Sequence, residues 1–225
     1  MATASSANDL HGHSMGHIAL HYVEEAMGPV AAKLLALIGF VETQMLPLPG
    51  GNFYRFVVNE QHRGRGDGIL YLSCVPPAQA ALVQAAREAL GHGTDTPHPA
   101  IAALREALDH DPEYSFHVGI LIDSLEELER ITLDLRARNE GDPDLKGRLK
   151  IVVNRPQPGD AEIDARLDAS PAFGDVTRYA YGRNGIQVFI ETDLLTSGPL
   201  GESMVLELDY IFPGRDSHIL SVVEL

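Results

Sequence analysis

The sequence contains one cysteine, no tryptophan, and 17 basic residues against 32 acidic ones. The single cysteine, Cys74, excludes an internal disulfide and a zinc site built from cysteines. A formal net charge of −15 would repel the phosphates of nucleic acids and anionic membrane surfaces, so neither is expected as a partner. No apolar run approaches the roughly 18 residues that span a bilayer, and the N-terminus has no secretory-signal pattern. These absences predict a cytoplasmic protein.

Familiar catalytic motifs are missing as well. The sequence has no GxSxG elbow and no HExxH pair, which leaves serine hydrolase and zincin activities without support. The glycine-rich GRGDG at 64–68 joins two strand-like runs and does not open a helix, so it predicts a turn and no phosphate loop. Cys74, in a buried-looking strand, is expected to be a small core residue.

The first part of the chain has a β-α-β-β-β pattern. Residues 1–15 are small and polar and predict a flexible arm. The module at 16–75 then opens with the strand HIALHY and continues into the helix VAAKLLALIGF, which Pro29 starts and Gly39 ends. Three strand-like runs follow, at 41–46, 52–59 and 68–75.

Residues 76–114 interrupt this pattern with two alanine-rich helical stretches, at about 78–90 and 100–108. They predict a helical insertion or linker between two modules. The DHDPE run at 109–113 is interpreted as a solvated acidic linker.

The same element order returns in residues 115–225. A strand at 116–122 is followed by a capping box, Ser124 with Glu127, in front of a helix at 125–138. Three strand-like runs complete the module, and they lie at 150–153, 185–192 and 203–212. The repeat predicts an α+β fold of two βαβββ modules that complete each other, with their first strands side by side.

A histidine opens the first strand of both modules, His17 in HIALHY and His117 in HVGILI. A single such histidine is most often structural, but two at equivalent positions can converge. In SMVLELDYIF, period-two alternation places Glu207 between leucines in a core strand, where a carboxylate is costly to bury unless it is paired or binds a cation. Two imidazoles and one carboxylate are the ligand set of non-haem iron(II) oxygenases.

These motifs carry a family resemblance. HIALHYVEEA with LLALIGF, and HVGILIDSLEELERI, resemble the module openings of the vicinal oxygen chelate superfamily, also called the glyoxalase/bleomycin resistance/dioxygenase family, and GPLGESMVLEL resembles its closing hairpin. The resemblance covers most of 16–212 outside the helical insertion. It implies two modules paired into a cup around a divalent metal, with His17, His117 and Glu207 as ligands.

The resemblance also bears on the reaction. Glyoxalase-type members usually take a fourth ligand from the last strand of the first module, which here is GILYLSCV and has no carboxylate or histidine. This favours an extradiol-type dioxygenase that uses Fe(II) and a small, catechol-like substrate. Two alternatives stay open: a glyoxalase-type isomerase or lyase with Zn(II), Ni(II) or Mn(II), and a metal-free, resistance-type protein that binds small molecules.

Further residues are candidates for roles beside the metal. His21, four residues beyond His17, is the candidate catalytic acid or base, or else a pocket wall. Tyr181, Arg183 and Gln187 flank the third strand of the second module and are candidates to contact the oxygens of a substrate. Small-molecule binding is expected, and a homodimer is a general expectation.

Overall fold

A computed structural model describes residues 14–180, 182, 184–198 and 200–214. Residues 1–13 of the expected N-terminal arm therefore lie outside the described part, as do Tyr181 and Arg183. None of the described helices combines the length and apolar character needed to cross a membrane.

Both modules have the expected element order. The strands of the first module are β1 (His17–Tyr22), β2 (Val41–Leu46), β3 (Phe53–Val57) and β4 (Ile69–Cys74). Those of the second are β5 (His117–Leu121), β6 (Leu149–Asn154), β7 (Gly185–Ser197) and β8 (Glu202–Ile211). The α-helices are α1 (Gly28–Leu37), α2 (Pro77–Ala89), α3 (Pro99–His110), α4 (Leu125–Gly141) and α5 (Ala161–Asp168).

Local sequence signals explain both ends of α1 and the start of α4. Pro29 lies in the first turn of α1, where its missing N–H costs no hydrogen bond, and Gly39 follows the helix with a φ of 107°. At the start of α4, the hydroxyl of Ser124 accepts the backbone N–H of Glu127 over 3.2 Å. The predicted start and end of α1 and the predicted start of α4 are confirmed.

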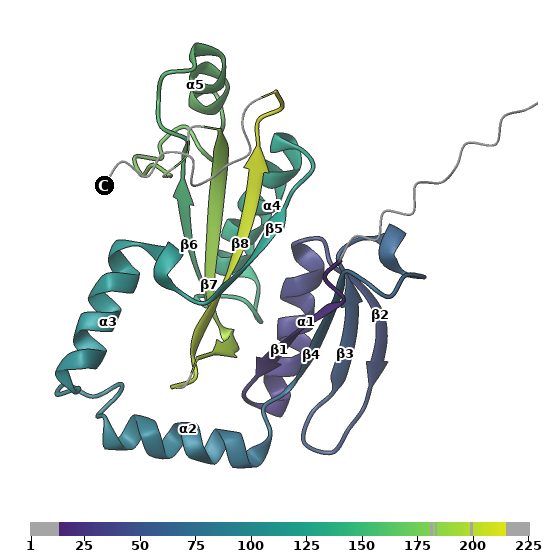
Figure 1. The fold of residues 1–225 in the computed structure, drawn as a ribbon, viewed down its shortest axis with the longest axis vertical. Coiled ribbons are helices and arrows are strands. Elements are labelled where there is room, and N and C mark those ends of the chain that lie inside the picture. Colours follow the sequence, from purple (N-terminus) through teal and green to yellow (C-terminus); the bar gives the residue numbers. More distant parts are fainter. Residues whose placement is uncertain (1–13, 181, 183, 199, 215–225) are drawn as a thin grey trace, which may run out of the picture.

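The eight strands form one sheet, in the order β2-β3-β4-β1-β7-β8-β5, with β6 paired to β7. In each module the first strand runs parallel to the last, β1 beside β4 and β5 beside β8, while the hairpins are antiparallel. Helices α1 and α4 cover one face and share a single apolar core with it, in which Leu34, Leu128 and Leu135 are fully buried (Figure 1). The α+β fold of two βαβββ units is confirmed.

The junction between the modules differs from the expectation. The first strands do not lie side by side: β1 pairs with the far end of β7 through His21 and Thr196, and β5 pairs with β8 alone among the described strands. The physical reason is the length of β7. Its 13 residues extend beyond the part that pairs with β6, and the additional part pairs with β1. An ion pair between Lys33 and Asp142, 2.8 Å long, also joins α1 to the end of α4.

The predicted helical insertion is confirmed as α2 and α3, which form an arch beside the sheet (Figure 1). The polar stretch between β6 and β7 contains one helix that the sequence analysis did not predict, α5. Asp160 caps its start, where its side chain accepts hydrogen bonds from the backbone N–H groups of Glu162 and Ile163.

Candidate metal site on the open face of the second module

The strand register brings one glycine and three polar residues together on the sheet face opposite α4. In the β5/β8 pair Gly119 lies beside Glu207, and in the β7/β8 pair Gln187 lies beside Asp209. Gly119 leaves room there, because a Cβ at this position would lie 3.6 Å from Oδ2 of Asp209 and 3.8 Å from Oε2 of Glu207. The space beside the two carboxylates is thus open because β5 has no side chain at this point.

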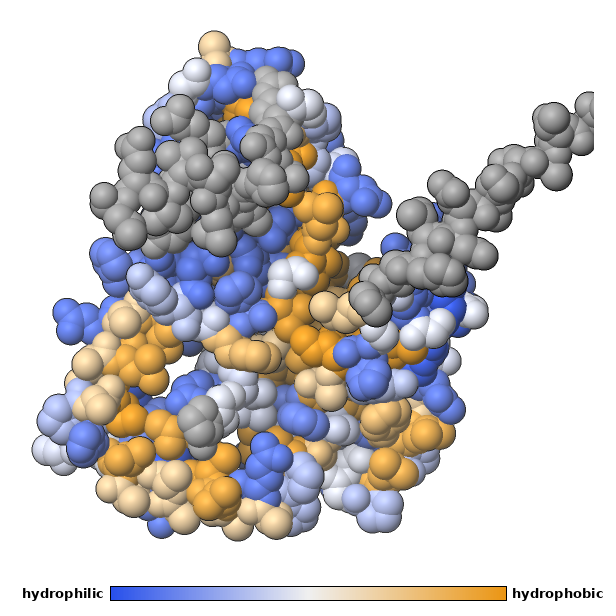
Figure 2. Space-filling view, in the orientation of Figure 1, coloured by the Kyte–Doolittle hydropathy of each residue, from blue (hydrophilic) through white to orange (hydrophobic). Residues whose placement is uncertain are grey.

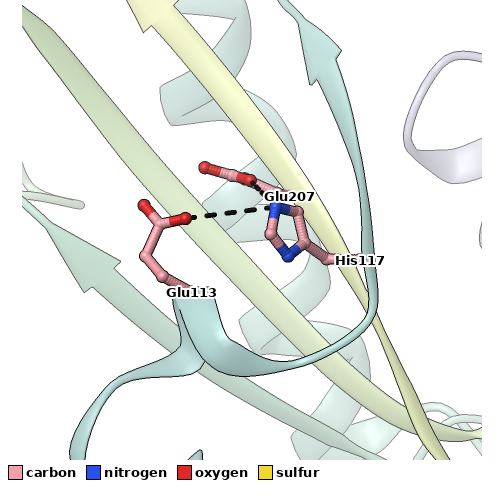
Figure 3. A group of neighbouring side chains, drawn as sticks. All are labelled: Glu113, His117 and Glu207. Carbon is pink, nitrogen blue, oxygen red and sulfur yellow. Dashed lines mark ion pairs between the residues drawn. The ribbon is translucent and has the colours of Figure 1, made fainter. Parts of the chain in front are cut away.

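His117 faces Glu207 across this space (Figure 3). Its Nε2 lies 3.0 Å from Oε2 of Glu207, and Glu207 is only 4% exposed. The other ring nitrogen, Nδ1, donates to the carbonyl oxygen of Ser115 over 2.9 Å. Since a carbonyl can only accept, this bond fixes the proton of a neutral His117 on Nδ1 and directs the lone pair of Nε2 toward Glu207.

A second carboxylate reaches the group from the end of the helical insertion. Glu113 lies in the short 3₁₀ turn Pro112–Tyr114, and its Oε2 is 4.0 Å from Nε2 of His117. Glu113, His117 and Glu207 each offer a donor atom within 4.8 Å of the others. The DHDPE run is therefore not simply a solvated linker: Glu113 is half-buried and belongs to this group, and Asp111 is buried.

Gln187 joins the two glutamates. Its Nε2 donates to Oε1 of Glu113 and to Oε1 of Glu207, both over 2.7 Å. Each carboxylate is thus held by one oxygen and presents the other toward His117. The Oε1 atom of Gln187 and the Oδ1 atom of Asp209 are buried without a hydrogen-bond partner among the described residues.

Acidic side chains outnumber basic ones in this group, and this affects their pKa values. The hydrogen bond with Glu207 raises the pKa of His117 to about 9. Burial, together with the adjacent charge of Glu207, raises the pKa of Asp209 to about 8. Burial also raises the pKa of Glu113, although the hydrogen bond from Gln187 acts in the opposite direction. Burial and the neighbouring Glu207 carboxylate thus both favour a proton on Asp209 and on Glu113.

Two of the distances between the donor atoms are compatible with a shared divalent metal ion. Two ligands at about 2.1 Å from one ion and roughly 90° apart are separated by about 3.0 Å, which is the 3.0 Å between Nε2 of His117 and Oε2 of Glu207. The 4.0 Å between His117 and Glu113 stays within the limit for two ligands on one ion, about 4.2 Å. A metal would replace the proton on Nε2 and neutralise the buried carboxylates.

The structure brings together two of the three expected ligands, His117 and Glu207. The third, His17, is exposed on β1 with its ring 5.2 Å from that of Tyr71, and it does not belong to the group. Because β1 is not next to β5, the two opening histidines do not converge. His21 hydrogen-bonds to Ser73 over 3.2 Å and lines another cavity, of about 440 Å³.

The sequence alone did not identify Glu113 as a site residue. It made Gln187 a candidate for substrate contact and gave Asp209 no role. The only signal for Asp209 is its place on the same strand face as Glu207, whereas Glu113 comes from a turn whose position no local pattern specifies. Gln187, a candidate to contact a substrate, donates to two carboxylates in the structure.

Comparison with solved structures identifies proteins of the expected kind. A possible glyoxalase from Bacillus cereus is 11% identical, with 89% of this chain and 99% of that chain covered and a TM-score of 0.36. A glyoxalase/bleomycin resistance protein/dioxygenase family enzyme from Burkholderia phytofirmans is 9% identical, with coverages of 89% and 100% and a TM-score of 0.37. A family protein from Nocardioides is 16% identical, with coverages of 92% and 88% and a TM-score of 0.37.

The strand order of this chain itself shows two βαβββ units joined in one sheet. No protein-family model and no curated protein matches the sequence. The reaction must therefore be argued from the residues of the site.

Proposed function

We propose that this protein is a metal-dependent enzyme of the dioxygenase type, which acts on a small substrate with two adjacent oxygen donors, such as a catechol-like diol. The observation that carries the proposal is the 3.0 Å approach of His117 Nε2 to Glu207 Oε2, with Glu113 as a third donor. This set differs from the expected two imidazoles and one carboxylate, because Glu113 stands in place of His17. Imidazole suits iron and carboxylates suit Mn(II), and Fe(II) is proposed because the proposed reaction uses oxygen.

When bound, the metal would supply Lewis acidity and a template for the substrate oxygens. Three donors from the protein leave coordination positions free for the substrate. The chain's own residues prepare the site: Ser115 fixes the tautomer of His117, and Gln187 orients both glutamates. Asp209, on the same strand face as Glu207 and not itself one of the proposed ligands, is the acidic side chain of the site proposed to accept a substrate proton.

Metal analysis after anaerobic purification tests this proposal. We expect about one iron per chain in the wild type, and loss of iron in Glu207→Gln and Glu113→Gln. The matched control is Glu60→Gln, because Glu60 lies in an exposed turn and pairs with Arg63 outside the site. Circular dichroism confirms that each variant is folded.

Oxygen consumption with catechol-like diols tests the reaction itself. Iron with diol-dependent oxygen uptake supports the proposal. Zinc or nickel with oxygen-independent turnover would instead indicate the isomerase or lyase, and stoichiometric binding of small molecules without any metal would indicate the resistance-type protein. Either result would overturn the dioxygenase.

A further inference from the structure

A cavity of about 540 Å³ lies between the helical arch and the sheet, and the residues that line it differ from those of the metal group. Helices α2 and α3 form one wall, and strands β6, β7 and β8 form the other. Figure 2 shows the hollow between the arch and the rest of the molecule, with apolar side chains around it. Its size is in the range of cavities that hold small organic molecules.

Two arginines in this cavity form no hydrogen bond or ion pair with the residues that the structure describes. Ten of the described arginines form a hydrogen bond or ion pair with the protein: Arg55, Arg63, Arg65, Arg130, Arg136, Arg138, Arg148, Arg155, Arg166 and Arg178. Arg87 on α2 and Arg105 on α3 form neither within the described part of the chain, and both line the cavity. The charge of Arg105 contributes to lowering the pKa of Asp109, but the two form no hydrogen bond or ion pair among the described residues, so both guanidinium groups can bind a ligand.

A histidine lies between them, in the connection from α2 to α3. His92 also lines the cavity, and its Nδ1 is buried without a hydrogen-bond partner among the described residues. Burial, then the charges of Arg87 and Arg105, lower the pKa of His92, so both guanidinium groups act on the same imidazole. Glu202 opposes them from the sheet side. Four further carboxylates line the cavity: Asp109 and Glu191 pair with Lys150, Asp193 pairs with Arg148, and Glu24 precedes the short turn before α1.

The remaining walls combine apolar and polar side chains. Ile101 and Leu104 of α3 and Phe189 and Val205 of the sheet line the cavity, together with polar residues such as Ser115, Thr196 and Ser203. Guanidinium groups bind carboxylates and phosphates with paired hydrogen bonds, and an apolar wall beside them favours a ligand that combines an anionic group with an apolar body. Phe189 and Val205 are also neighbours of His117, so the inner end of the cavity adjoins the metal group.

We propose that the helical insertion forms a binding site for a small organic anion, in which Arg87, Arg105 and His92 bind a carboxylate or phosphate and the apolar walls bind the rest of the molecule. This inference goes beyond the proposed metal chemistry and stands without it. It gives the insertion a role in ligand binding in addition to its role as a connection between modules.

A pair of fluorescent probes tests the site on the full-length protein. 1-Anilinonaphthalene-8-sulfonate carries an anionic group on an apolar body, and N-phenyl-1-naphthylamine has the same body without the charge. We expect the anionic probe to bind one per chain and the double variant Arg87→Gln/Arg105→Gln to weaken it by at least about tenfold. Binding of the neutral probe should change by less than about twofold, since the apolar walls remain.

The matched control is Arg63→Gln/Arg130→Gln, which removes two exposed arginines that pair with glutamates outside the cavity. Unchanged anion binding in the cavity variant overturns the proposal, as does an equal loss in the control, which would reflect overall charge. An equal loss of both probes in the cavity variant overturns it too.

Competition distinguishes the anionic groups, because naphthalene-2-carboxylate and 2-naphthyl phosphate should each displace the probe if their group is accepted. Failure of both to displace it overturns the proposal. Iron content is measured on the same samples: a cavity variant that keeps both its iron and its probe affinity refutes the anion site alone, whereas iron absent from every sample refutes the metal proposal alone.

Discussion

The amide of Gln187 on β7 donates to a carboxylate oxygen of Glu207 on the neighbouring strand β8, over 2.7 Å and out of contact with solvent. The same nitrogen reaches Glu113 at the same distance. One neutral side chain thus sets the orientation of both acidic ligands that we propose.

Replacement of Gln187 by leucine should therefore weaken the metal site without removing a ligand. We expect Gln187→Leu to lower the affinity for Fe(II) or Mn(II) by about 10–100-fold, the usual effect of losing a partner that orients metal ligands. Titration of the metal-free protein with Mn(II) measures this. Gln44→Leu, at an exposed position of β2, is the control and should bind as the wild type does. Equal affinities in both variants would contradict the role of Gln187.

The stability of the metal-free protein should fall as the pH rises. The folded protein keeps a proton on Asp209 up to a pKa of about 8, while the unfolded chain loses it above its ordinary value of 3.8. His117 behaves in the same direction, with a pKa of about 9 in the folded state against 6.5. Between these values the unfolded state binds fewer protons, so the free energy of unfolding decreases with pH.

We expect the melting temperature of the metal-free protein to drop by at least about 3 °C between pH 6 and pH 9. In Asp209→Asn the slope should be shallower, because one of the two groups no longer titrates. A melting temperature that rises over this range would show that Asp209 and His117 are not held in their protonated forms.

Metal affinity should show the opposite trend. A metal bound to Nε2 of His117 must displace the proton that the hydrogen bond with Glu207 stabilises, and the pKa of that proton is about 9. We expect the association constant to rise by about tenfold per pH unit below pH 9. Competition titrations with Mn(II) at pH 6, 7 and 8 measure this slope, and a constant affinity would exclude His117 as a ligand.

Tyr22 and Gly28 offer a test of the core of the first module. Tyr22 is fully buried, and a Cβ on Gly28 would lie 2.7 Å from Cζ of its ring. Gly28→Ala should therefore lower the free energy of unfolding by about 1–3 kcal/mol, the usual cost of overpacking. Gly141→Ala, at the end of α4 where nothing lies within 4 Å, should have little effect or stabilise. Chemical denaturation compares the two variants.

The sequence predicts best what depends on neighbouring residues. The start of α4 is predicted by Ser124, and the partners of Glu207 could be sought on one strand face because side chains alternate there. His117 and Glu207 meet as expected because β5 and β8 pair in parallel, which the repeated element order implies.

Other features depend on distances that no local pattern encodes. Pairing of β1 with the end of β7 depends on how far β7 extends beyond β6, and this separates His17 from His117. Glu113 reaches the site only because the arch of α2 and α3 returns the chain to the sheet just before β5. Neither the length of an overhanging strand nor the path of an insertion follows from residue periodicity.

The position of β5 in the sheet has a consequence for how the protein behaves as it loosens. Among the described strands this outermost one has a neighbour on one side only, yet it carries His117. Backbone amides at such a border open more readily than those in the middle of a sheet. A cation bridging His117 to Glu207 would clamp that border strand to β8, so the rate at which its amide protons exchange with deuterium becomes a direct gauge of occupancy.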